Sequence, residues 1–125
     1  MISFVLDTSA FLSLESISLL DIIFTNFKII TTSSVFRELD DFANYDDVLG
    51  NIAREVLKKK AEITIEDQPF QIKLHFVSKT DNELFNLAQS KKLSLITDDL
   101  KLQRHCSGKT ITDFSTIFLL IFVDS

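Results

Sequence analysis

The stretch Ile2-Ser3-Phe4-Val5-Leu6-Asp7-Thr8-Ser9 decides the fold class of this chain. Its apolar run, residues 2–6, has the length and composition of a buried β-strand. The run ends abruptly in Asp-Thr-Ser, three side chains that commonly cap a helix N-terminus, and apolar residues resume in 10–14. The stretch therefore predicts a buried strand that leads directly into a helix.

The alternation of strand and helix continues along the chain. Apolar residues at helical spacing indicate helices, and short β-branched or alternating runs indicate strands. Strand and helix alternate at least three times, which favours an α/β fold with a mainly parallel central sheet and helices on its faces. We expect helices at residues 10–14, 17–27, 34–42, 48–60, 80–90, 98–106 and near the C-terminus, strands at 2–6, 28–31, 93–97 and 109–112, and a hairpin over 63–76.

Composition bounds the class of protein. The 125 residues fit a single domain, spanning 1–125, and 46% hydrophobic with 25% charged residues is ordinary for a globular protein. Two glycines and one proline leave no room for a flexible linker. The single cysteine, Cys106, excludes an internal disulfide, and together with only two histidines it excludes a zinc finger.

Neither end of the sequence predicts a membrane or export segment. No basic segment precedes the first apolar run, and Asp7 interrupts that run at once. The apolar run 117–123 is far shorter than the ~20 residues that a membrane-spanning helix needs. We therefore expect a cytoplasmic protein that makes no membrane contact.

The formal net charge of −5 argues against a passive nucleic-acid binder, which is usually basic. That argument weakens if the surplus carboxylates gather in one pocket with metal ions, because bound cations reverse the local charge. The position of the acidic residues therefore decides how the charge is interpreted.

Acidic side chains follow the predicted strands at the points where the strands end. Asp7 follows the first strand, Asp98 and Asp99 follow the strand 93–97, and Glu38 lies in the first turns of the helix after the second strand. Sites in parallel sheets lie beyond the carboxyl ends of the strands, so we expect these acids at one edge.

Helical spacing refines the position of the acids in helices. Glu38 borders the apolar stripe of its helix, whereas Arg37 and Asp41 are expected to point away. Asp81 lies on the inward face of the next helix, in its first turn, where Thr80 and Glu83 form a capping box. A carboxylate on an inward face is costly unless something pairs with it.

The repulsion among such carboxylates predicts a cation. Two carboxylates ~4 Å apart repel by roughly 4 kcal/mol at an effective dielectric of about 20. Four or five together would offset much of the ~5–15 kcal/mol stability of a domain. Mg²⁺ and Mn²⁺ prefer carboxylate oxygens and water, so either ion is the expected partner.

Each acid also has an ordinary structural explanation. Asp7 would cap the first helix, and Asp81 would favour the helix dipole. Glu38 would be a flank residue, and Asp98 or Asp99 an exposed helix start. The shared placement at one edge of the sheet is what favours a metal site.

The chain resembles PIN domains in four stretches taken in order. These are Phe4–Leu12, Ile30–Leu39, Lys79–Ala88 and Leu95–Leu100. The resemblance implies a three-layer α/β fold and a divalent-metal-dependent endoribonuclease. It also implies that Asp7, Glu38 and Asp81 are catalytic metal ligands and that Asp98 or Asp99 is the fourth.

Several further expectations surround this acidic set. Ser9 and Thr97 are expected to orient carboxylates or water. Lys101 and Arg104, which follow the acidic pair in the same predicted helix, are candidates for contact with the RNA backbone. One or two Mg²⁺ or Mn²⁺ ions would activate water for hydrolysis of a phosphodiester bond.

The resemblance leaves the biological role open. Within the PIN domains, the chain is similar to endonucleases that mature ribosomal RNA, although it lacks their zinc ribbon, and to VapC toxins, whose length it shares. The expected partners are RNA, an antitoxin or ribosome-assembly protein, and a second copy of the chain. An inactive protein-binding scaffold is the competing class, and a phosphoacceptor receiver domain is disfavoured because only Asp7 follows the first strand.

Overall fold

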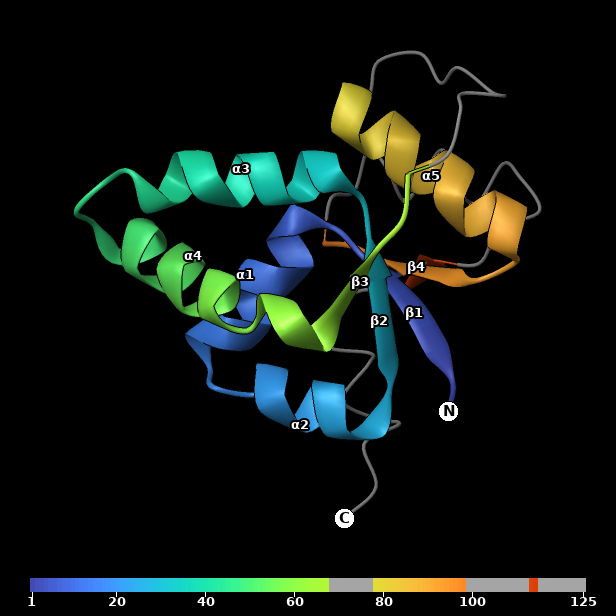
Figure 1. Ribbon diagram of the computed structural model, residues 1–125, viewed down its shortest axis with the longest axis horizontal. Helices are drawn as coiled ribbons and strands as arrows, with labels where there is room; N and C mark the ends of the chain where they lie inside the picture. The colour runs from blue at the N-terminus through green and yellow to red at the C-terminus, as the bar shows by residue number, and fades with distance from the viewer. Residues whose placement is uncertain (68–77, 99–112, 115–125) are drawn as a thin grey trace.

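The computed structural model describes residues 1–67, 78–98 and the backbone of 113–114 (Figure 1). Within these residues, five strands form one sheet in the order β3-β2-β1-β4-β5, and every neighbouring pair is parallel. The predicted parallel sheet is therefore confirmed. The strands are β1 (Ser3–Leu6), β2 (Lys28–Thr31), β3 (Ile63–Ile65), β4 (Ser94–Ile96) and β5 (Asp113–Phe114).

Helices cover both faces of the sheet. Figure 1 shows α1 to α4 on one side and α5 on the other, where α5 packs against β1 and β4. This arrangement confirms the three-layer α/β fold. The helices are α1 (Thr8–Ser16), α2 (Leu20–Asn26), α3 (Ser33–Ala43), α4 (Val48–Lys58) and α5 (Lys79–Lys91), and a 3₁₀ turn, η1 (Lys60–Glu62), follows α4.

The central strand β1 explains why the first apolar run is continuous rather than alternating. A strand buried on both faces carries apolar side chains in both directions. Val5 and Leu6 are fully buried, and Phe4 packs edge-to-face on Phe27 with ring centroids 5.0 Å apart. Because β1 is packed on both faces up to Leu6, the position of Asp7 directly after the strand is also fixed.

Several predicted boundaries were wrong for local reasons. The expected helix 17–27 begins only at Leu20, because Ser18 adopts a left-handed conformation (φ 58°) that separates α1 from α2. The helix α5 begins at Lys79 and not at Thr80, because the Ser78 hydroxyl accepts a hydrogen bond from the Asp81 amide at 3.1 Å. The N-cap residue is therefore Ser78, two residues before the predicted Thr80.

The start of α3 also differs from the prediction. Thr32 occupies the N-cap position, but its hydroxyl makes no capping bond and has no hydrogen-bond partner among the described residues. The Ser33 amide instead donates to Asp67 Oδ1 at 2.9 Å, so a carboxylate that follows β3 caps this helix. Residue 63 begins a strand as expected, but β3 pairs in parallel with β2.

Four expectations fall outside the described residues: the second arm of the hairpin, the helix 98–106 beyond its first residue, the strand 109–112, and the C-terminal helix with its apolar run 117–123. In the described ranges, no single helix is long and apolar enough to cross a membrane, and α1 with α2 passes a test of length and composition only as a pair bent by 113°.

The topology gathers helix N-termini at one edge of the sheet. Because all strands are parallel, their carboxyl ends lie together, and α1 and α3 begin directly after β1 and β2. Figure 1 shows the first turn of α5 beside the first turn of α3. Positive helix N-termini favour nearby carboxylates, so this edge is suited to acidic side chains.

Candidate active site

Asp7 is buried at the junction of β1 and α1, with 4% of its surface exposed. Its Oδ1 accepts hydrogen bonds from the Ala10 amide and the Ser9 hydroxyl, each at 2.8 Å, and its Oδ2 accepts from the Thr97 hydroxyl. Asp7 therefore caps α1, as the ordinary structural explanation held, and it also faces the cavity described below. The two roles are compatible.

The environment of Asp7 disfavours its charge. Burial raises the pKa of this carboxyl from 3.8 to about 6, and the negative charge of Asp81 adds to the rise. The hydrogen bonds from Thr97, Ala10 and Ser9 lower the pKa but do not offset the burial. The expected positions of Ser9 and Thr97 beside the acidic set are thus observed: both hydroxyls donate to Asp7.

Glu38 is tied to the first residue of α1. The Thr8 hydroxyl donates to Glu38 Oε1 at 2.5 Å, across 30 residues of sequence. Glu38 is partly buried on the side of α3 that borders the apolar stripe, as its spacing predicted. This bond holds the second acidic side chain beside the residue that follows Asp7.

One cavity of about 530 Å³ brings the acids of three elements together. Three acids predicted from the sequence, Asp7, Glu38 and Asp81, face the same space. Asp41 also lines it, so the expectation that Asp41 points away was wrong: it lies three residues after Glu38 and shares its face of α3. The other lining residues are Thr8, Ser9, Leu12, Phe42, Tyr45 and Ser78.

The fourth predicted acidic position lies at the border of the described structure. Asp98 is exposed, and its Oδ2 accepts from the Ser13 hydroxyl at 3.2 Å. The Asp98 amide approaches Ser9 Oγ at 3.5 Å, so Ser9 stands between Asp7 and Asp98. Among the described residues, Asp98 is not part of the cavity lining. Asp99, Lys101 and Arg104 lie outside the described residues.

The donor chemistry of the cavity fits a hard divalent cation. Its described lining offers four carboxylates and several hydroxyls, with no sulfur or imidazole. Within residues 1–67, 78–98 and 113–114, however, no three Asp, Glu, His or Cys side chains stand close enough together to hold an ion. Asp7 is engaged by Ser9, Ala10 and Thr97, and Glu38 by Thr8. The predicted acids therefore face the same cavity, but among the described residues they are not close enough together to hold one ion.

Comparison with known families decides the classification. A sequence profile of the DUF3368 family, described as a PIN domain, matches residues 3–123. The chain belongs to the PIN-domain family. PIN domains are typically nucleases and generally use divalent metal ions, so at this coarse level the chain is a nuclease. No curated protein matches the sequence.

Solved structures share the fold of this PIN domain at low identity. PAE2754 from Pyrobaculum aerophilum is 19% identical with a TM-score of 0.71, over 98% of this chain and 96% of that one. VapBC-1 from nontypeable Haemophilus influenzae is 16% identical with a TM-score of 0.64, over 93% and 99%. VapBC2 from Rickettsia felis, bound to a DNA fragment from their promoter, is 15% identical with a TM-score of 0.63, over 91% and 98%.

The sequence interpretation missed part of this PIN-domain cavity. The three-residue spacing from Glu38 was a signal for Asp41 that the interpretation did not use, and the position of Thr8 directly after Asp7 was a further signal. Tyr45 had no such signal, because it lies in the connection between α3 and α4, whose path depends on how the two helices pack. Ser78 was not predicted, because the sequence interpretation placed the start of this helix too late in the chain.

Proposed function

We propose that this PIN domain is a divalent-cation-dependent endoribonuclease. The observation that carries the proposal is the shared cavity: Asp7, Glu38 and Asp81, from three separate elements, face one space at the carboxyl edge of the sheet. Ordinary capping explains Asp7 alone, but it gives no reason for Glu38 and Asp81 to face the same space. A nuclease site that binds a divalent cation would explain why all three carboxylates face one space.

In this proposal the residues have three roles: they hold the cation, orient its ligands or contact the RNA. Asp7, Glu38 and Asp81 would hold Mg²⁺ or Mn²⁺, with Asp98 or Asp99 as a fourth ligand and Asp41 nearby. When bound, the cation would activate water and neutralise charge on the phosphate. Ser9 and Thr97 orient the Asp7 carboxylate, and Thr8 orients Glu38. Lys101 and Arg104 remain the proposed contacts to the RNA backbone.

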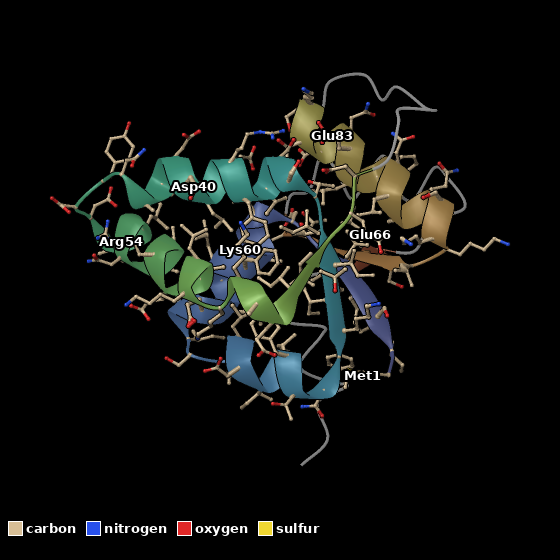
Figure 2. The ribbon with its side chains drawn as sticks, viewed as in Figure 1. Met1, Asp40, Arg54, Lys60, Glu66 and Glu83 are labelled. Carbon is tan, nitrogen blue, oxygen red and sulfur yellow. The ribbon has the colours of Figure 1, made fainter. Side chains whose placement is uncertain are left out.

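Cleavage of a generic RNA tests this proposal. With Mg²⁺ or Mn²⁺ we expect cleavage by the wild type, no cleavage with EDTA, and a loss of at least about 100-fold in Asp7→Asn or Asp81→Asn. Asp40→Asn is the matched control, because Asp40 is exposed on α3 next to the cavity residues and does not line the cavity (Figure 2). A folded Asp7→Asn protein that cleaves as fast as the wild type would sink the proposal.

A toxin of a toxin–antitoxin pair is the proposed setting for this activity. Its support is the likeness of fold to two VapBC proteins over at least 91% of the chain. In that setting a small antitoxin would bind the chain and stop cleavage. Site-restricted cleavage of a ribosomal RNA precursor, with no inhibitory partner, would point instead to RNA maturation.

An inactive scaffold is the remaining alternative, and it would bind partners without cleaving any RNA. The single-domain organisation over 1–125, the cytoplasmic location and the homodimer stay predictions, which size-exclusion chromatography and localisation of the tagged protein would test.

A further inference from the structure

The cavity lining contains apolar and aromatic side chains as well as acids. The lining residues without an acidic group include Leu12, Phe42 and Tyr45. Tyr45 is 64% exposed, although large aromatic side chains usually bury most of their surface. An exposed ring that also lines an acidic cavity is placed to meet whatever enters that cavity.

Hydrogen bonds from α4 hold the backbone that carries Tyr45. Arg54 on α4, labelled in Figure 2, donates from Nη1 to the carbonyl oxygens of Ala43 at 2.6 Å and Tyr45 at 3.1 Å. The Gly50 amide donates to Asp47 Oδ1 at 2.7 Å, which caps α4 directly after this connection.

Glycine is required at residue 50. A Cβ there would lie 1.9 Å from the Tyr45 carbonyl oxygen, a distance that no other side chain tolerates. Because the backbone is already ordered, a ligand that stacks on the ring pays little ordering entropy. The chain thus presents one aromatic side chain on a preorganised support.

The charge of the cavity indicates which part of an RNA would contact Tyr45. The described lining of the cavity contains no lysine or arginine, so apart from a bound cation it offers no attraction to the phosphates of RNA. Base–aromatic stacking is an uncharged interaction that every base can make, and aromatic side chains use it to hold unpaired nucleotides. A stacked base would hold the adjacent phosphate near the acids.

We propose that Tyr45 stacks on an unpaired nucleobase next to the scissile phosphate and thereby positions the RNA in the cavity. This inference rests on the proposed nuclease function. Duplex RNA is disfavoured because its bases already stack on one another and present no free face. A protein partner is the competing occupant, since Val48 and Leu49 are also exposed beside Tyr45. Those two do not line the cavity, which favours the nucleobase.

Steady-state kinetics on single-stranded RNA give the first test. Tyr45→Ala is expected to raise KM by about ten-fold, the size of one lost base–aromatic stack, with kcat within about two-fold. Tyr45→Phe keeps the stacking face and should behave as the wild type. Val48→Ala removes an apolar group that is 74% exposed and lies outside the cavity lining, and it should also leave KM unchanged. Equal KM for Tyr45→Ala and wild type, or an equal rise in Val48→Ala, would overturn the inference.

A binding measurement separates this inference from the nuclease proposal. The chain has one tyrosine and no tryptophan, so Tyr45→Trp creates a single fluorophore that can be excited where nucleobases do not absorb. In an Asp7→Asn background, which is not required to cleave, oligouridylate should quench this fluorescence. An abasic oligomer of the same length should not, and neither oligomer should quench Val48→Trp. Equal responses to the two oligomers, or no response, would refute stacking even if the wild type cleaves RNA. Base-dependent quenching would uphold it even if cleavage fails.

Discussion

The Thr97 hydroxyl donates a hydrogen bond to Asp7 Oδ2, across 90 residues of sequence. The sheet register explains the contact: Leu6 pairs with Ile96, so the next residue of each strand leaves the sheet at the same level. The Asp7 amide also donates to the Ile96 carbonyl oxygen at 3.2 Å. Two buried polar residues that end neighbouring strands thus form one unit, and the candidate active site is built around it.

Thr97→Val tests whether this bond controls the charge of Asp7. Valine keeps the shape of threonine and removes the donor, so the pKa of Asp7 should rise further and the pH of half-maximal cleavage should move upward. The pH–rate profile is the measurement. Thr31→Val is the control: the Thr31 hydroxyl, also buried at a strand end, donates to the Leu6 carbonyl oxygen at 2.7 Å. An unshifted Thr97→Val profile would show that the bond does not set the ionisation.

Asp7 should destabilise the metal-free protein at neutral pH. Because burial raises its pKa from 3.8 to about 6, the folded protein holds a proton that the unfolded chain has lost between these values. Its contribution to stability is complete below about pH 4 and lost by about pH 6, a change of about 3 kcal/mol at 1.36 kcal/mol per unit.

Asp7→Asn isolates this contribution, because asparagine also caps a helix N-terminus well. In EDTA, its free energy of unfolding relative to wild type should increase by about 3 kcal/mol between about pH 4 and pH 7, in the stabilising direction. Urea denaturation at the two pH values measures the difference. A difference that does not change with pH would contradict the pKa shift.

Gly50→Ala should destabilise the protein, although alanine favours helices by about 1 kcal/mol over glycine. The added Cβ would lie 1.9 Å from the Tyr45 carbonyl oxygen and 2.9 Å from that of Phe42, so α4 must move. We expect a loss of about 3 kcal/mol, the upper range for overpacking. Glu55→Ala, an exposed change on the same helix, should change the stability far less in the same urea experiment. A stabilised Gly50→Ala protein would show that the α3–α4 connection is looser than described.

Ser34→Ala should loosen the contact between α3 and α5. The Ser34 hydroxyl accepts from Arg37 Nη2 at 2.8 Å and donates to Glu83 Oε2 at 2.9 Å. Removing it leaves a partly buried carboxylate without this donor, at a cost of about 1 kcal/mol. Thermal unfolding compares it with Ser16→Ala, whose exposed hydroxyl donates within its own helix to the Ser13 carbonyl oxygen at 2.7 Å. Equal melting temperatures of the two variants would argue against the link.

The predictable part of the fold was that in which local sequence and burial agree. The strand Lys28–Thr31 and the junction of β1 with Asp7 were predicted correctly, because β-branched and apolar residues at the sheet centre have one stable placement. The shared carboxyl edge of parallel strands placed Asp7 and Glu38 at one site, and helical spacing placed Asp81 on the inward face of its helix.

The remainder depends on contacts between distant residues. Asp67 caps α3 from 34 residues away, a role that no spacing in the sequence encodes. Tyr45 reaches the cavity only because Arg54 and Gly50 shape the α3–α4 connection. The distances among the carboxylates depend on such packing, so the sequence predicts an acidic site without giving its geometry.

Binding of Mn²⁺ to the purified protein, followed by electron paramagnetic resonance, tests the central claim most directly. The wild type should bind the ion, and Asp7→Asn and Asp81→Asn should each weaken binding by about ten-fold or more, because each removes one carboxylate from the cavity. Asp40→Asn, which changes an exposed acid outside the cavity lining, should bind as the wild type does. Equal Mn²⁺ affinity in all four proteins would contradict the account.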